Sequence, residues 1–406
     1  MPHELIALLI FAGTYLTLAT GSFPGLRVDR TGAAVIGAGL MAGFGVLSFE
    51  EAVKAVDFPT IVLLFGTMIV VANLRLSGFF DWVGEQALEH AHRPLTLLAA
   101  VIGVTGVLSA LFVNDTMCLV MTPLVLETAL ALGLNPVPYL LAVAMASNAG
   151  SVAAITGNPQ NMMIGSMSGI SYAAFTGALA PVALASLAMT WALLAWVYRV
   201  ELGARKVLPD VKKAVPVDQV LLWKSLTVTA GMIAFFFAGW PVSKAALFAG
   251  AILLITRRVH PEDVYRQIDF PLLALFTGLF IVVAGFEKTR VEEELVTWAR
   301  GLRLERIGML SFASTAVSNI VSNVPAVLLF RPVVQRLADV ETGWLTLAMS
   351  STLAGNLTLV GSVANLIVVE RARGKASIGF WEYFRVGAPL TLLSVTFGAV
   401  WLWWTR

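Results

Sequence analysis

The sequence contains two copies of one pattern, and both copies lie in segments apolar enough to cross a membrane. DFPTIVLLFGTMIVVAN, at residues 57–73, recurs as DFPLLALFTGLFIVVAG, at residues 269–285. SALFVNDTMCLVMTPLV, at 109–125, aligns with SNIVSNVPAVLLFRPVV, at 318–334. Agreement over separated blocks indicates an internal duplication, so we expect the chain to fold as two copies of one unit.

The composition is typical of a membrane protein. Of the 406 residues, 58% are hydrophobic and only 13% are charged, whereas about 25% are charged in an ordinary soluble domain. The formal net charge of +2 and the lack of a basic arm give no support for nucleic-acid binding. The single cysteine, Cys118, excludes a Cys-based metal cluster, and the four histidines lie outside the apolar runs. We therefore expect a protein of the lipid bilayer with no metal site and no cofactor.

Four apolar runs are interrupted by polar residues. The runs 95–132 and 307–337 are interrupted near their centres, and we expect each to form a re-entrant helical hairpin. The runs 136–168 and 344–369 predict discontinuous helices. Each copy then crosses the membrane about five times, or about seven times if the hairpins cross fully. Because either number is odd, the second copy is inserted upside down, as in many secondary transporters.

The predicted fold class is therefore an all-α polytopic membrane protein of two inverted-topology repeats, each with about five spans, a re-entrant helical hairpin and one discontinuous helix. Repeat 1 is assigned to residues 1–199, a cytoplasmic linker to 200–220 and repeat 2 to 221–406. The face that carries most Lys and Arg residues, including those of the linker, is expected in the cytoplasm. This predicts a multi-pass protein of the cytoplasmic membrane with both termini outside.

Each discontinuous helix is interrupted by a short polar motif. The motifs are ITGNPQN at 155–161 and VGSVAN at 360–365, with Gly157 aligned to Gly361 and Asn161 to Asn365. Unpaired backbone groups in hydrocarbon cost several kcal/mol each, so such a break persists only beside protein or a water-filled cavity. The broken ends can hold a solute; a pair of accidental kinks is the alternative. The candidate ligands are Thr156, Gly157, Asn158, Asn161, Gly361, Ser362 and Asn365.

Asp115 is the main candidate for coupling transport to protons. It lies at the centre of the first hairpin run, and an ionisable group inside a membrane is costly and usually functional. Burial favours the neutral form of a carboxyl group, so this side chain can carry a proton. The alternative is a structural cap at the N-terminus of the following half-helix. The corresponding residue of the second copy is Val324, so only one copy has the acid.

Neutral side chains at the two hairpin tips can also contact a solute, because amide and hydroxyl groups offer both donors and acceptors. They are Asn114 and Thr116 at the first tip and Ser322 and Asn323 at the second. Packing contacts between helices are the alternative role. No Lys or Arg lies in either tip or either motif, which suits a neutral solute better than a dianion.

Three segments carry a family resemblance. They are ALFVNDTMCLVMTP, with its Asn-Asp tip, the acid-free second tip SNVP, and the C-terminal block VGSVANLIVVERARGKASIGFWEYFRVG. They resemble the ion-transporter superfamily of ArsB-type arsenite efflux pumps, NhaD-type sodium/proton antiporters and divalent-anion/sodium symporters, and are most similar to the ArsB type. The Ser-Asn-Thr signature of the sodium/dicarboxylate branch is not met, and TGNPQNMMIG departs from the best-known arsenite pumps.

The resemblance implies a secondary active transporter, not an enzyme, that exports arsenite or antimonite in exchange for protons. Asp115 would take up the proton, and Cys118 alone cannot form a three-thiolate arsenic site. A homodimer and a soluble ATPase partner are also compatible with the resemblance. The alternatives are a sodium- or proton-coupled symporter for citrate, a dicarboxylate or sulfate, a sodium/proton antiporter, and a passive channel.

Overall fold

The computed structural model describes the chain except for residues 1, 23–25, 90–92, 204–216, 290, 292, 293, 295, 296, 298 and 300. The predicted linker at 200–220 therefore lies largely outside the described residues. The described part consists of helices, with one isolated β-bridge between Ser22 and Asp29. Seven of these helices are long and apolar enough to cross a membrane. The all-α membrane fold predicted from the sequence is confirmed.

The helices of the N-terminal half follow the duplicated pattern, and η marks a 3₁₀ helix. They are α1 (Pro2–Thr20), α2 (Arg30–Gly43), α3 (Phe49–Ala55), α4 (Phe58–Leu76), α5 (Phe79–Glu89), α6 (Pro94–Leu111), α7 (Asn114–Ala131), α8 (Val137–Ser151), η1 (Ile155–Gly157), α9 (Pro159–Ser168), α10 (Tyr172–Val197) and α11 (Arg199–Leu202).

The C-terminal half repeats this order. Its described helices are α12 (Gln219–Phe237), α13 (Val242–Leu254), α14 (Pro261–Tyr265), α15 (Phe270–Glu287), α17 (Ile307–Val321), α18 (Asn323–Val334), α19 (Val340–Ala354), η2 (Leu359–Gly361), α20 (Val363–Ala372) and α21 (Phe380–Thr405).

The duplicated DFP motif starts the same kind of helix in both halves. The carboxylate of Asp57 accepts a hydrogen bond from the backbone N–H of Thr60 at 3.2 Å, and that of Asp269 accepts one from Leu272 at 2.9 Å. Each aspartate thus pairs one of the N–H groups that a helix start leaves free, and a proline in the first turn has no N–H to pair. The aspartates therefore position the first turns of α4 and α15.

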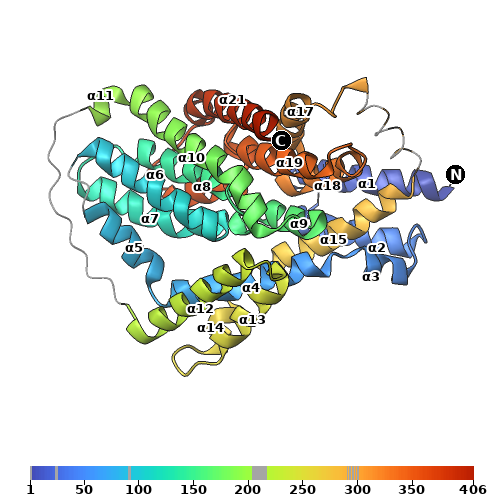
Figure 1. Cartoon of the computed structure of the whole chain (residues 1–406), viewed down its shortest axis with the longest axis horizontal. Coiled ribbons are helices and arrows are strands. Elements are labelled where there is room, and N and C mark those ends of the chain that lie inside the picture. Colours follow the sequence, from blue (N-terminus) through green and yellow to red (C-terminus); the bar gives the residue numbers. More distant parts are fainter. Residues whose placement is uncertain are drawn as a thin grey trace.

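Two helix pairs join the halves in the lower layer of Figure 1. α4 packs against α13, and α15 packs against α2. A Cβ on Gly66 would lie 2.6 Å from the backbone of Ala246, and one on Gly278 would lie 2.6 Å from the backbone of Ala34. Gly66 and Gly278 occupy matching positions of the duplicated block. The glycine helix of each half thus packs in the same way against a helix of the other half. This exchange of roles between the halves is what an inverted repeat requires.

The hairpins and broken helices form the other layer of Figure 1. The hairpins are α6–α7, which breaks at residues 112–113, and α17–α18, which breaks at Ser322; the broken helices are α8–η1–α9 and α19–η2–α20. α6 packs against α8, and α17 packs against α19. The second segment of each broken helix packs on the hairpin of the other half, α20 on α7 and α9 on α18. The hairpins and discontinuous helices predicted from the sequence are confirmed. Segments of both halves therefore meet where the hairpins contact the broken helices.

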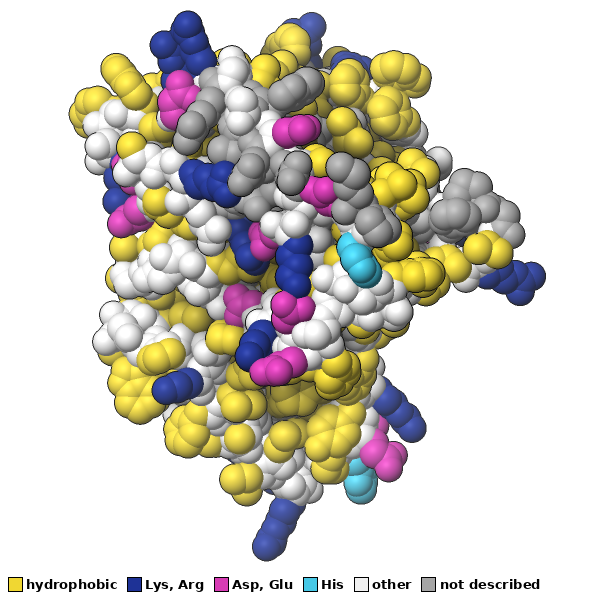
Figure 2. All heavy atoms as spheres, turned by 90° about the vertical axis from the view of Figure 1, so that its right-hand side faces the viewer, with side chains coloured by type: hydrophobic (Ala, Val, Ile, Leu, Met, Phe, Trp, Pro, Cys, Tyr) yellow, Lys and Arg dark blue, Asp and Glu magenta, His cyan; other side chains and the backbone are white. Residues whose placement is uncertain are grey.

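Charged side chains mark one end of the molecule. Figure 2 views the end near the N-terminus and shows acidic and basic side chains in a central strip, with hydrophobic side chains on both sides. Two ion pairs join separate helices by α15: Lys288 to Glu51 at 2.7 Å and Arg331 to Glu287 at 2.8 Å. Apolar sides and charged ends are typical of helices that cross lipid and end in water.

Candidate functional site

An asparagine closes the break in each discontinuous helix. The Nδ2 group of Asn161 donates hydrogen bonds to the carbonyl oxygens of Ser151, at 3.0 Å, and Ala154, at 3.2 Å. In the other half, Asn365 does the same to Gly355, at 2.7 Å, and to the carbonyl of Thr358, at 3.1 Å. These carbonyl oxygens lie where the regular helix ends, so the amide groups supply bonds that the break removes.

The first residue after each break caps the second half-helix. The Oδ1 atom of Asn158 accepts a hydrogen bond from the backbone N–H of Asn161 at 2.8 Å, and the Oγ atom of Ser362 accepts one from Ala364 at 3.3 Å. Short polar side chains at this position are favoured because they pair N–H groups that the helix leaves free. The two half-helices α9 and α20 therefore start at equivalent, capped positions.

The two broken helices bind each other through a crossed pair of contacts. Asn148, on α8, donates to the Oδ1 atom of Asn365 at 3.1 Å and accepts from the Oγ atom of Ser362 at 3.1 Å. It is completely buried. Asn148 was not among the residues predicted from the sequence. It is the one amide side chain of α8, a half-helix with no charged residue, and this is the signal that could have found it.

Thr352 makes the reciprocal contact from α19. Its hydroxyl group donates to the Oδ1 atom of Asn161 at 3.3 Å and accepts from the Nδ2 atom of Asn158 at 3.1 Å. Gln160 also donates to it, at 3.3 Å. Thr352 aligns with Asn148 when Gly157 is aligned with Gly361, so the sequence alignment of the halves could have identified this pair.

The hairpin tips meet the helix breaks at a small cavity of about 80 Å³. It is lined by Leu18, Arg30, Asn114, Asp115, Pro159, Gln160, Leu272, Leu275, Ser322, Asn323, Val324, Pro325, Ser362 and Val363. Two of these residues, Asn114 and Asn323, are the first residues of α7 and α18 and occupy matching positions of the two halves. The Oδ1 atoms of both are buried and have no hydrogen-bond partner within the described part of the chain. Each hairpin tip therefore has a buried amide oxygen that no described group pairs, on a residue of the cavity lining.

Asp115 lies between this cavity and a second one. The second cavity has a volume of about 160 Å³, and its lining includes Asp115, Thr116, Arg75, Gln267 and Asp269. α7 begins at Asn114, so Asp115 lies in the first turn of the helix and not at its cap. No described residue donates a hydrogen bond to its carboxylate. The side chain is therefore available to a proton or a solute in either cavity.

Arg30 was not among the site residues predicted from the sequence. It is the first residue of α2 and lines the 80 Å³ cavity together with Asp115. Neither tip and neither motif has a Lys or Arg, as the sequence showed, but the fold brings a basic residue to the cavity from a segment far from all four. Its Nε atom is buried without a partner among the described residues. One acidic and one basic side chain thus line the same cavity.

The second tip has an unusual backbone. Ser322 lies between α17 and α18 and has a φ of 76°. Non-glycine residues rarely adopt positive φ values, and such strain tends to occur at functional sites. The matching position of the first tip, Val113, has a φ of −61°. The two tips therefore differ in backbone conformation, and only the first tip has an acidic residue.

The predicted ligands fall into three groups. Asn114, Asp115, Ser322, Asn323 and Ser362 line the 80 Å³ cavity, and Thr116 lines the second cavity. The others are buried around the breaks and line neither cavity; they are Thr156, Gly157, Asn158, Asn161, Gly361 and Asn365.

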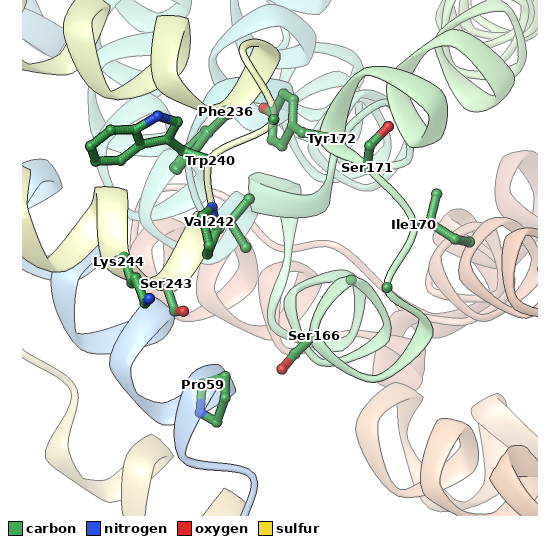
Figure 3. Close-up of a pocket in the computed structure, with 14 residues that line it drawn as sticks. Pro59, Ser166, Ile170, Ser171, Tyr172, Phe236, Trp240, Val242, Ser243 and Lys244 are labelled. Carbon is green, nitrogen blue, oxygen red and sulfur yellow. The ribbon is translucent and has the colours of Figure 1, made fainter.

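A third cavity of about 440 Å³ lies by the other end of α4. Pro59, at the N-terminus of α4, lines it, whereas Arg75, near the C-terminus, lines the 160 Å³ cavity. Figure 3 shows Ser166, Ile170 and Tyr172 on one side and Ser243 and Lys244 on the other. The hydroxyl groups of Tyr172 and Thr156 are 2.9 Å apart, which connects this cavity to the first break. Cavities therefore adjoin both ends of α4, and Asp115 lines the one at its C-terminal end.

Residues 6–354 match the sequence model of the citrate transporter family, CitMHS. The chain belongs to this family. It is 31% identical to the silicon efflux transporter LSI3 of Oryza sativa subsp. japonica, over 98% of the chain and 97% of the relative. It is 32% identical to an uncharacterised transporter of Mycobacterium tuberculosis, over 98% of both chains. A transporter of Dictyostelium discoideum named arsB is 25% identical over 96% of the chain and 89% of the relative.

The solved structure of the YdaH transporter of Alcanivorax borkumensis has the same fold. Its TM-score is 0.60 at 14% sequence identity, over 100% of this chain and 98% of that one. The family match and the similar transporters confirm the resemblance to the ion-transporter superfamily. This member of the citrate transporter family is a multi-pass secondary transporter.

Proposed function

We propose that this transporter exports arsenite or antimonite from the cytoplasm in exchange for protons. At neutral pH arsenite is largely an uncharged trihydroxide, whose hydroxyl groups donate hydrogen bonds. The observation that carries the proposal is the small cavity between the hairpin tips, where neutral hydroxyl and amide side chains of both halves gather, among them Asn114, Ser322 and Asn323. Such groups offer both donors and acceptors to a hydroxylated solute.

The charges around the cavity agree with a neutral solute. Asp115 and Arg30 carry opposite charges, so the formal charges of the cavity lining sum to zero. A neutral ligand adds no charge that would need compensation in a low-dielectric site. The name of the silicon efflux relative supports the same class of solute, because silicic acid is also an uncharged hydroxylated acid at neutral pH.

Asp115 is the proposed proton carrier. It lines both the 80 Å³ cavity and the 160 Å³ cavity, so one side chain can sense the solute and exchange a proton through the second cavity. Exchange requires that the proton and the solute weaken each other's binding, and that the site changes sides only when one of them is bound. A protonated Asp115 would form one loaded state, and the solute bound beside an ionised Asp115 would form the other.

A citrate symporter is the second candidate, and Arg30 is the observation that favours it. A guanidinium group suits a carboxylate, and the family model carries the citrate name. However, Arg30 is the one basic residue among the described residues that line the 80 Å³ cavity, and Asp115 opposes an anion there. The charges therefore favour the neutral solute.

Expression in an arsenite-sensitive bacterial host tests the proposal. We expect cells with the transporter to grow at arsenite concentrations that stop the control cells and to contain less arsenic, because export lowers the cytoplasmic concentration. Cells carrying the empty vector and cells expressing Asp115→Asn are the controls. Unchanged resistance and unchanged cell arsenic, with the protein present in the membrane, would contradict the proposal; citrate uptake in the same cells would support the second candidate.

A further inference from the structure

The duplicated DFP motif supplies two aspartates with the same capping role but different surroundings. Asp57 and Asp269 occupy matching positions, and each caps the helix that follows it, α4 or α15. Asp57 also accepts a hydrogen bond from the hydroxyl group of Ser166 at 3.0 Å, and it is not among the residues that line the 80, 160 or 440 Å³ cavities. Asp269 lines the 160 Å³ cavity together with Asp115. Capping alone does not explain this second location.

The 160 Å³ cavity joins a partly buried acid to an exposed one. Asp115 is partly buried, whereas Asp269 is exposed. Asp269 follows the segment 257–267, which is rich in charged residues and mostly exposed, as expected of a segment in water. The two carboxylates are close enough for their charges to interact. Asp269 therefore gives this cavity an acidic group that is in contact with solvent.

The cavity has the size and the lining to hold water between the two acids. Its volume of about 160 Å³ is several times what one water molecule needs. Arg75, Thr116 and Gln267 line it beside the aspartates, so a water molecule finds hydrogen-bond partners there. Neighbouring water molecules pass protons along their hydrogen bonds. The cavity can thus carry protons although no hydrogen bond joins the two carboxylates within the described chain.

The one basic residue of this lining does not form an ion pair with either aspartate. The Nη1 atom of Arg75 donates to the Oε1 atom of Gln267 at 2.8 Å, and neither aspartate forms an ion pair with Arg75 within the described chain. The formal charges of the cavity lining, two aspartates and one arginine, sum to −1. Uptake of one proton therefore makes the lining neutral, which a low-dielectric environment favours.

The other charged groups on the packed helices do not line this cavity. Of the helices packed against α15, α2 and α4 carry one charged residue each, Arg30 and Arg75, and the charges of α1, α3 and α18 lie toward the other end of α15. On α7 itself, Glu127 lies toward the other end. Of the helices packed against α7, α6 and α8 carry none; the charged residues of α5 and α20 include Asp81, Glu85, Glu89, Glu370 and Arg371.

We propose that Asp269 is a second proton-carrying residue, which passes protons between Asp115 and the solvent through the 160 Å³ cavity. The proposal rests on the proposed function, because it takes Asp115 as the proton carrier. Protonated Asp115 gives its proton to a water molecule of the cavity, a second water molecule gives one to the carboxylate of Asp269, and Asp269 releases it to the solvent. No other bond changes. The Arg-rich end is expected in the cytoplasm, so the proton is released there.

The experiment compares Asp269→Asn with its matched control, Asp57→Asn, in proteoliposomes. Asparagine caps a helix about as well as aspartate does, so both variants should unfold at temperatures like that of wild type. We expect Asp269→Asn to lose most of the proton-driven arsenite flux and Asp57→Asn to keep it. Asp269→Glu, which retains a carboxyl group, should restore the flux. Exchange of arsenite for arsenite without a gradient needs no proton, so every variant should keep it.

Three results would overturn the inference. The first is a proton-driven flux, with its pH dependence, that is the same in Asp269→Asn and Asp57→Asn. The second is a loss that both variants share, because it would assign the effect to the helix caps. The third is a flux that a sodium gradient drives and Asp269→Asn abolishes, because the cavity would then bind a metal cation and not relay protons.

Citrate uptake separates this inference from the arsenite proposal. If wild type takes up citrate with protons but does not move arsenite, and Asp269→Asn loses that uptake, the arsenite function fails and the role of Asp269 stands. If wild type exports arsenite with protons and Asp269→Asn does so at the same rate, the function stands and the role of Asp269 fails. If protons drive neither solute, both fail.

Discussion

Replacing Asp115 with asparagine is expected to abolish proton-driven export. The substitution keeps the size of the side chain but removes the group that takes up and releases a proton. Flux driven by a proton gradient should fall to the rate seen without a gradient, because the ionisable group that would couple the two flows is lost. Initial rates of arsenite efflux from proteoliposomes, with and without a proton gradient, measure the effect.

The control for this prediction is Glu262→Gln, which removes an exposed carboxylate on α14. It should transport like wild type. Asp115→Asn should still fold, because its carboxylate has no hydrogen-bond donor among the described residues, and it can still exchange arsenite for arsenite without a gradient. A variant that keeps the wild-type response to the proton gradient would show that Asp115 does not carry the proton.

Gly157→Ala is expected to disrupt the first break and with it transport. A Cβ at residue 157 would lie 2.2 Å from the carbonyl oxygen of Ser151 and 2.7 Å from its Cα atom. Backbone atoms cannot rotate away as a side chain can, so the methyl group must displace one end of the broken helix. Overpacking of this kind costs about 1–3 kcal/mol or more. We expect a lower unfolding temperature in detergent and a large loss of flux.

Gly361→Ala is the matched control in the other half. A Cβ there would lie 2.7 Å from the Oδ1 atom of Asn319 and 3.2 Å from the Oγ1 atom of Thr358, and 3.3 Å from the nearest backbone atom, the carbonyl oxygen of Ala354. The closest atoms belong to side chains that can turn, so the cost should be smaller. If Gly157→Ala unfolds at the same temperature as Gly361→Ala or higher, the first break is not packed as described.

The fold was predictable because the duplication supplies the same information twice. The interrupted runs appear in both halves with matching residues, such as Gly157 with Gly361, and hydrocarbon tolerates such breaks only where they are enclosed. The first hairpin breaks at residues 112–113, just before the polar pair that signalled it. The pair itself begins α7, since a helix start accommodates polar residues beside its free N–H groups.

The roles of the polar residues were less predictable. Asn161 and Asn365 are typical ligands in sequence, yet their Nδ2 groups donate to backbone carbonyls at the breaks. Whether an amide group faces a solute or the backbone depends on geometry that no sequence pattern specifies. Arg30 gave no signal because its approach to the cavity depends on how α2 packs against α15.

The central claim is that a single cavity between the hairpin tips couples arsenite to protons. The most direct measurement is the flux of arsenite in proteoliposomes that contain the wild-type protein, with the proton gradient imposed in one direction and then in the other. Inward proton flow should drive arsenite out of the vesicles, and outward proton flow should drive it in, above the leak of protein-free vesicles. An arsenite flux that ignores the direction of the gradient would contradict the claim.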